Sequence, residues 1–279
     1  MVHERLVTLF ENSPLGAVVV VLLVGLAVAY LIGIAARRIH IRLAANSGEL
    51  DGREGQIIAA VLGLLALLLG FTFSLAVDRF ENRRLLVLDE ANAISTAYLR
   101  AQLLDEPYRQ GISQLLIDYA KNRVELGGPY GNSQELVASD SMLVELWRET
   151  VVAFPTIEPP SFAAQFVGSI NEIVDLDAAR KAGREAKVPT SVFVVLIFFL
   201  CVASAVLGYM STGIWTRIVS GSLFLLLTLA LLLVIDIDRP LKGSIKESQK
   251  PMVDLEQFLI ANPPATFGSP GQVIAPTRP

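Results

Sequence analysis

The sequence has little of what enzymes commonly use for chemistry. It contains one cysteine, Cys201, and two histidines, His3 and His40, among 279 residues. A single cysteine can form neither an internal disulfide nor a thiolate cluster, and two histidines in the N-terminal region show no metal-ligand spacing. No Walker loop, H-E-x-x-H, G-x-S-x-G or dinucleotide-binding glycine pattern occurs. We therefore expect no catalytic residue, no metal site and no cofactor.

Charged residues are also scarce, at 18% of the chain against about 25% in a typical soluble domain. The shortage is confined to four stretches that lack Asp, Glu, Lys and Arg: 12–36, 55–77, 188–216 and 218–235. A helix crosses the hydrocarbon core of a bilayer with about 20 residues. This pattern excludes a soluble enzyme, a β-barrel and a disordered chain. It predicts four transmembrane helices, at about 15–36, 57–77, 190–210 and 218–237, and the first stretch is too long for a cleaved leader.

The residues between the crossings indicate an all-α protein. The insert 78–188 carries 12 basic and 17 acidic residues, and apolar positions recur in it at helical spacing without the alternation of a strand. One such stripe suggests helix packing along a continuation of the second crossing: Val87, Glu90, Ile94, Ala97, Ala101 and Leu104. We therefore predict a transmembrane hairpin (1–77), a helical extramembrane domain (78–188) and a second hairpin (189–238). A tail (239–262) with a short helix at about 251–261 follows, and the proline-rich residues 263–279 are expected to be disordered.

The two hairpins place the N-terminus, the insert and the tail on one side of the membrane. Near the crossings, twelve Lys and Arg residues lie on that side and five on the other, which favours a cytoplasmic insert in the inner membrane. The first crossing taken alone favours the opposite orientation. A net charge of −4 and the lack of a basic stripe argue against nucleic acid, so the lipid bilayer is the expected partner.

Charges gather at the ends of the second and fourth crossings: Asp78, Arg79, Asp236, Asp238 and Arg239. Such border charges commonly anchor a helix by snorkelling, whereas their functional alternative is an electrostatic ring at the mouth of a pore. If Arg79 pairs with Asp236 or Asp238, removing one partner should be destabilising. The neighbouring acids Asp89 and Glu90 are expected on a solvated helix face or at a cap.

One face of the second crossing combines small, hydroxyl and bulky apolar side chains. Gly63, Leu67, Phe71 and Ser74 share this face by i, i+4 and i+3 spacing. They could pack inside the helical bundle of one subunit. They could instead line a pore in which Leu67 and Phe71 form an apolar constriction.

Three runs of the sequence carry a family resemblance: LGFTFSLAVDRFENRR (69–84), DEANAISTAYLRAQLLDEPYR (89–109) and DIDRPLKGSI (236–245). With these runs the chain resembles the bacterial bestrophin-like family and, more distantly, the bestrophin channels. The resemblance implies a homo-oligomer, with five subunits as in bestrophins, that conducts chloride or other anions. A non-conducting membrane-anchored scaffold or sensor module remains the alternative.

The sequence also departs from bestrophins in two places. Gly63, Leu67 and Phe71 stand where the resemblance places the bulky Ile and Phe side chains of the bestrophin neck, so only one aromatic is kept. The tail lacks the dense acidic run that binds Ca²⁺ in animal bestrophins, because Asp254 and Glu256 are too few. Calcium gating is therefore not expected.

Overall fold

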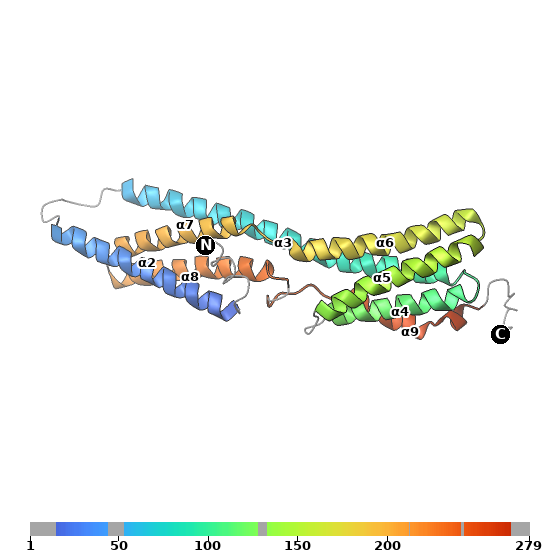
Figure 1. The fold of residues 1–279 in the computed structure, drawn as a ribbon. Coiled ribbons are helices and arrows are strands. Elements are labelled where there is room, and N and C mark those ends of the chain that lie inside the picture. The colour runs from blue at the N-terminus through green and yellow to red at the C-terminus, as the bar shows by residue number, and fades with distance from the viewer. Residues whose placement is uncertain (1–14, 44–52, 128–132, 212, 241–242, 269–279) are drawn as a thin grey trace, which may run out of the picture. The chain divides into compact units, whose positions relative to one another are not determined.

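The computed structural model describes residues 15–43, 53–127, 133–211, 213–240 and 243–268 (Figure 1). These residues are almost entirely helical and contain no strand, which confirms the all-α prediction. The helices are α2 (Leu15–Leu43), α3 (Arg53–Ala101), α4 (Tyr108–Gly127), α5 (Ser133–Ala153), α6 (Pro160–Glu185), α7 (Thr190–Met210), α8 (Ile214–Ile237) and α9 (Lys250–Ala261). Two short 3-10 helices, η1 (Phe154–Thr156) and η2 (Pro264–Phe267), complete the list.

The described residues within 1–80 and 186–246 form one compact unit, built from α2, the first part of α3, α7 and α8. Four helices of the described chain are long and apolar enough to cross a membrane, as predicted. Leucines such as Leu26, Leu65, Leu196 and Leu231 fill the interior of this unit. Its outward positions are equally apolar, as expected for helices surrounded by lipid: Val21, Leu31, Phe198 and Leu226 are exposed.

Within this unit α2 and α7 approach each other so closely that their backbones touch. A Cβ added at Gly33 would overlap the carbonyl of Ala205, and one added at Gly208 would overlap the carbonyl of Tyr30. Small residues permit such close approach of membrane helices. Ser204 Oγ donates a 3.0 Å hydrogen bond to the carbonyl of Leu26 across this contact.

The described residues within 81–185 and 247–268 form the second unit, a bundle of the remainder of α3 with α4, α5 and α6. Helix α9 packs along α4 in this bundle. The predicted stripe from Val87 to Leu104 is buried in this bundle, as expected, but α3 ends at Ala101, so Leu104 lies in the turn after the helix. The C-terminal prediction was partly wrong, because η2 is ordered where disorder was expected. The ring of Phe267 packs edge-on against Tyr98, and Arg109 donates a hydrogen bond to the carbonyl of Gly268. Residues 269–279 of that prediction lie outside the described part of the chain.

Candidate functional site

The first part of α3 has a buried face and an exposed face. Leu65 and Leu69 point into the helical unit, and Leu65 is only 2% exposed. Thr72 is also buried. Its hydroxyl donates a 2.8 Å hydrogen bond to the carbonyl of Leu68, so the side chain brings no unpaired hydrogen-bond donor into the apolar interior. Three residues thus anchor α3 to its neighbours through one side.

The four residues proposed to line a pore all lie on the exposed face of α3. Leu67 is 53% exposed and Phe71 67% exposed, and Gly63 and Ser74 are exposed as well. Packing inside one subunit therefore does not account for these side chains among the described residues. The face is available for lipid, for a second copy of the chain or for a central axis.

The border charges divide into one exposed group and one built into a turn. Asp78 is exposed and lies one helical turn after Ser74 on α3. Asp236 is buried at the end of α8, where its carboxylate accepts hydrogen bonds from the backbone N–H (2.7 Å) and the hydroxyl of Ser244. Asp238 is buried too, and its two oxygens accept the N–H of Val188 at 3.0 and 3.1 Å.

These bonds make both aspartates structural groups. Asp238 ties the end of α8 to the segment just before α7, and Asp236 fixes the turn that follows α8. A Cβ added at Gly243 would overlap the carbonyl oxygen of Asp236, so glycine is needed there. The ion pair of Arg79 with Asp236 or Asp238, considered from the sequence as one possibility, is not among the contacts of the described residues. Arg79 is half-buried, and its Nη1 atom has no hydrogen-bond partner among these residues. Arg239 is half-buried at the same end.

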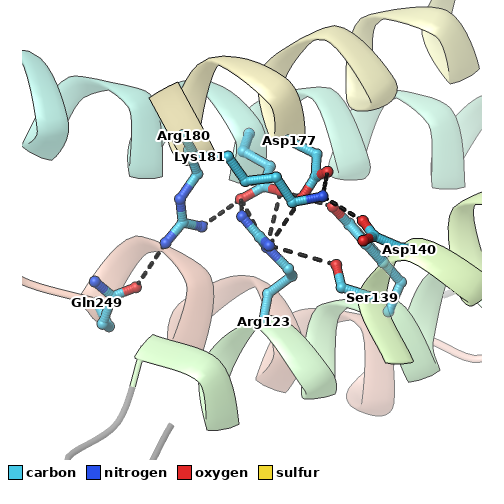
Figure 2. A network of polar contacts seen from close by, with 9 residues as sticks. Arg123, Ser139, Asp140, Asp177, Arg180, Lys181 and Gln249 are labelled. Carbon is cyan, nitrogen blue, oxygen red and sulfur yellow. Dashed lines mark hydrogen bonds and ion pairs between the residues drawn. The ribbon is translucent and has the colours of Figure 1, made fainter. Parts of the chain in front are cut away.

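The second unit contains a buried network of charges centred on Glu90 of α3. Figure 2 shows the side chains around it, among them Arg123, Asp177 and Arg180. Glu90 is fully buried and accepts hydrogen bonds from the Tyr119 hydroxyl (2.8 Å) and from the guanidinium groups of Arg123 and Arg180. Arg123 Nε lies 2.9 Å from Glu90 Oε1, and Arg123 Nη1 lies 2.9 Å from Asp177 Oδ1. Arg180 donates a further hydrogen bond to Gln249. One carboxylate thus joins α3, α4 and α6.

The network changes the pKa values of its members in directions set by burial and charge. Burial raises the pKa of Tyr119 well above its usual value, and the neighbouring carboxylate of Glu90 raises it further. Burial, the largest single effect, would lower the pKa of Arg123, but Glu90, Tyr119 and Asp177 together outweigh it and the net shift is upward. Burial lowers the pKa of Arg184, and the like charges of Arg180 and Arg123 add to this shift.

Comparison with known proteins identifies the family. A model of the Bestrophin-like domain matches residues 21–252 of the chain. The chain belongs to the bestrophin-like family. No curated relative matches its sequence.

The fold of this bestrophin-like protein is similar to that of a bacterial bestrophin homolog from Klebsiella pneumoniae. A crystal structure of a single-substitution variant of that homolog gives a TM-score of 0.69 at 14% identity, covering 90% of this chain and 98% of that chain. The structure of the homolog solved by Zn-SAD phasing gives a TM-score of 0.67 at 14% identity, with 89% and 97% covered. At this identity the similarity shows the shared fold.

Sequence reasoning misplaced one residue of this bestrophin-like protein. Asp89 is exposed as expected, but Glu90 is buried, so a solvated position for Glu90 was wrong. The signal was present, since Glu90 stands three residues after Val87 and four before Ile94, in the stripe predicted to pack. A carboxylate at such a position requires cationic partners, which Arg123 and Arg180 supply.

Proposed function

We propose that this bestrophin-like membrane protein assembles as a homo-oligomer, a pentamer in the bestrophin manner, and that the assembly is an anion channel. The observation that supports the proposal most directly is the exposed face of α3. Copies arranged around an axis would place Gly63, Leu67, Phe71 and Ser74 toward that axis, while the opposite face of α3 stays anchored through Leu65 and Leu69.

Leu67 and Phe71 would form two stacked apolar rings in this assembly. A narrow apolar ring stops ions by dewetting, because an ion cannot exchange its hydration shell for alkyl or aryl side chains. Gly63 and Ser74 would leave wider, wetter segments on either side of the rings. Asp78, one turn beyond Ser74, would form a charged ring at the border, whereas Asp236 and Asp238 are occupied in the turn after α8.

The conducted anion is chloride or a larger anion. A larger anion is more weakly hydrated than chloride, so it crosses an apolar ring at a lower free-energy cost than chloride does. The proposal also places the N-terminus, the helical unit 81–185 and the C-terminal tail in the cytoplasm of a cell with the protein in its inner membrane. The lysine and arginine residues near the crossings support this orientation, with twelve on the side of the insert and five on the other.

The test is anion flux from liposomes that contain the purified protein. Shortening either ring should widen the constriction, so Leu67→Ala and Phe71→Ala are expected to raise chloride flux above that of the wild type. The matched control is Leu226→Ala on α8, which removes an exposed leucine outside α3 and should leave flux unchanged.

Crosslinking in native membranes completes the test. Crosslinked products that extend up to five subunits support the pentamer. If only monomers are recovered, the channel proposal is refuted. Intact oligomers whose Leu67 and Phe71 variants stay as silent as the wild type would favour the non-conducting scaffold.

A further inference from the structure

The buried network of the second unit contains more positive than negative side chains. Three carboxylates belong to it: Glu90, Asp177 and Glu247. Four guanidinium groups accompany them: Arg83, Arg123, Arg180 and Arg184. At the rim of the network an ion pair between Lys181 and Asp140 adds one charge of each sign. The network therefore keeps an excess of one positive charge.

Arg184 is the arginine of this network that lacks a carboxylate partner. The other three are each at most 4% exposed, and each lies within 4.0 Å of a carboxylate: Arg83, Arg123 and Arg180. Arg184 is half-buried, and within the described part of the chain it makes neither a hydrogen bond nor an ion pair. Its guanidinium group therefore keeps donors for a ligand that reaches it from solvent.

Arg184 lies in the last turn of α6, where this helix packs against α3. A Cβ added at Gly183 would come within 3.1 Å of the Leu86 side chain and 3.7 Å of that of Arg83. The partial negative charge at the C-terminal end of a helix favours a cation there. This effect stabilises the charge of Arg184 but does not occupy the N–H groups of its side chain.

The ionised neighbours of Arg184 create a positive field at its position. Burial lowers the pKa of Arg184, and the charges of Arg180 and Arg123 each lower it more than Glu247 or Glu90 raises it. The field that opposes the charge of Arg184 attracts an anion placed beside it. Charge excess, free donors and field thus coincide at one partly exposed side chain.

We propose that Arg184 binds a phosphate group, with Arg180 and Arg83 supplying further positive charge. A guanidinium group can donate two parallel hydrogen bonds to the oxygens of a phosphate. In the sequence, Arg184 stands six residues before the third crossing (190–210) and Arg83 six residues after the second (57–77). Basic side chains next to a crossing are within reach of anionic lipid headgroups. An anionic phospholipid therefore fits the site, and inorganic phosphate shares its chemistry.

The experiment is calorimetric titration of the full-length protein in neutral detergent micelles at constant ionic strength. The probes are short-chain phosphatidylglycerol, phosphatidylcholine of the same chain length and inorganic phosphate. We expect saturable binding of one phosphate-bearing ligand per chain, and tighter binding of phosphatidylglycerol than of phosphatidylcholine. Saturation by phosphatidylglycerol alone identifies a lipid headgroup as the ligand. Saturation by inorganic phosphate, with no tighter binding of phosphatidylglycerol, identifies the free anion.

Substitutions separate this site from a general attraction between anions and the protein. Arg184→Gln should weaken binding at least about tenfold, the loss expected for hydrogen bonds to one charged group. Arg184→Lys should restore part of the loss, because it keeps the charge without the paired donors. The matched control is Arg84→Gln, which removes the same charge from an exposed arginine paired with Glu81 and should change affinity by less than about twofold.

Glu247→Gln should have the opposite effect and tighten binding, because it removes a carboxylate that opposes an anion at Arg184. Unchanged affinity in Arg184→Gln, an equal loss in Arg84→Gln, or no saturation by phosphatidylglycerol and by inorganic phosphate would overturn the proposal. Thermal unfolding of each variant shows whether a loss of binding comes from the site or from misfolding. If Arg184→Gln fails to fold, weaker binding in Glu247→Gln would overturn the proposal equally.

Discussion

The two units bury polar groups in different ways. Along the membrane helices the buried groups include hydroxyls, such as Thr72 and Thr228, and each donates to a carbonyl one turn earlier in its own helix. The buried carboxylates of this unit, Asp236 and Asp238, lie at the end of α8 and accept backbone N–H groups. In the second unit the buried groups include full charges, with Glu90, Arg123 and Asp177 joined in one network.

The difference follows from the surroundings of each unit. A hydroxyl that bonds to its own helix introduces little unmet polarity into lipid, whereas a charge at membrane depth is costly. In the second unit each buried charge has partners of opposite sign. We infer that the membrane unit depends on close packing and the second unit on its buried ion pairs, so different substitutions should destabilise them.

The largest expected effect comes from breaking the pairing in the second unit. Glu90→Ala leaves Arg123 and Arg180 without their shared carboxylate, and an uncompensated buried charge costs about 3–5 kcal/mol. The free energy of unfolding, measured by denaturant titration in detergent, should fall by this amount. The control is Asp89→Ala, which removes an exposed neighbouring carboxylate and should change stability by less than about 0.5 kcal/mol. Similar losses in both variants would show that the network contributes no pairing energy.

Most of the fold could be predicted from the sequence, because uncharged stretches of about 20 residues have few alternatives to membrane helices. The third crossing was predicted at 190–210 and α7 is Thr190–Met210. The helices themselves extend past the predicted crossings at charged residues. α2 continues to Leu43 past Arg37, and α8 starts at Ile214 before Arg217, because a charge ends the apolar stretch without ending the helix.

The candidate pore face could be predicted as well, since residues spaced i, i+3 and i+4 on one helix share a face whatever surrounds them. The ion network could not be predicted in the same way. Glu90, Arg123 and Arg180 lie on three helices and meet only after the bundle forms. Likewise, the carboxylate of Asp236 could have served Arg79, and only the folded turn shows that Ser244 occupies it.

A smaller effect should follow from breaking the close packing of the membrane unit. Gly208→Ala places a methyl group on the carbonyl of Tyr30 and forces α7 away from α2. Overpacking of this kind costs about 1–3 kcal/mol. Gly25→Ala is the matched control, because a Cβ at Gly25 meets nothing within 4 Å and alanine favours the helix. Thermal unfolding midpoints should fall for Gly208→Ala and stay level or rise for Gly25→Ala, and the reverse order would refute backbone contact between α2 and α7.

The smallest expected effect is a dependence of stability on pH that comes from Tyr119 in the buried network of the second unit. Burial and Glu90 raise the pKa of Tyr119, so the folded protein keeps this proton at a pH where the unfolded chain has released it. The unfolded state then binds fewer protons than the folded state, and stability falls as the pH rises above about 10, the ordinary pKa of tyrosine. One such group contributes a slope of at most about 1.4 kcal/mol per pH unit. Lys181, whose pKa is raised by hydrogen bonds to Asp140 and Asp177 against the effect of its burial, acts in the same direction but is partly exposed and contributes less.

The Tyr119→Phe variant measures how much of the loss of stability at alkaline pH comes from this tyrosine. The variant loses the hydrogen bond to Glu90, so its baseline stability is lower at every pH, and the slope above pH 10 is the informative quantity. We expect unfolding midpoints recorded between about pH 8 and 11 to decline less steeply in the variant than in the wild type. The other tyrosines and Lys181 are present in both proteins and cancel in the comparison. Parallel curves would mean that Tyr119 titrates alike in the folded and unfolded chain, and that the network around Glu90 leaves its hydroxyl open to solvent.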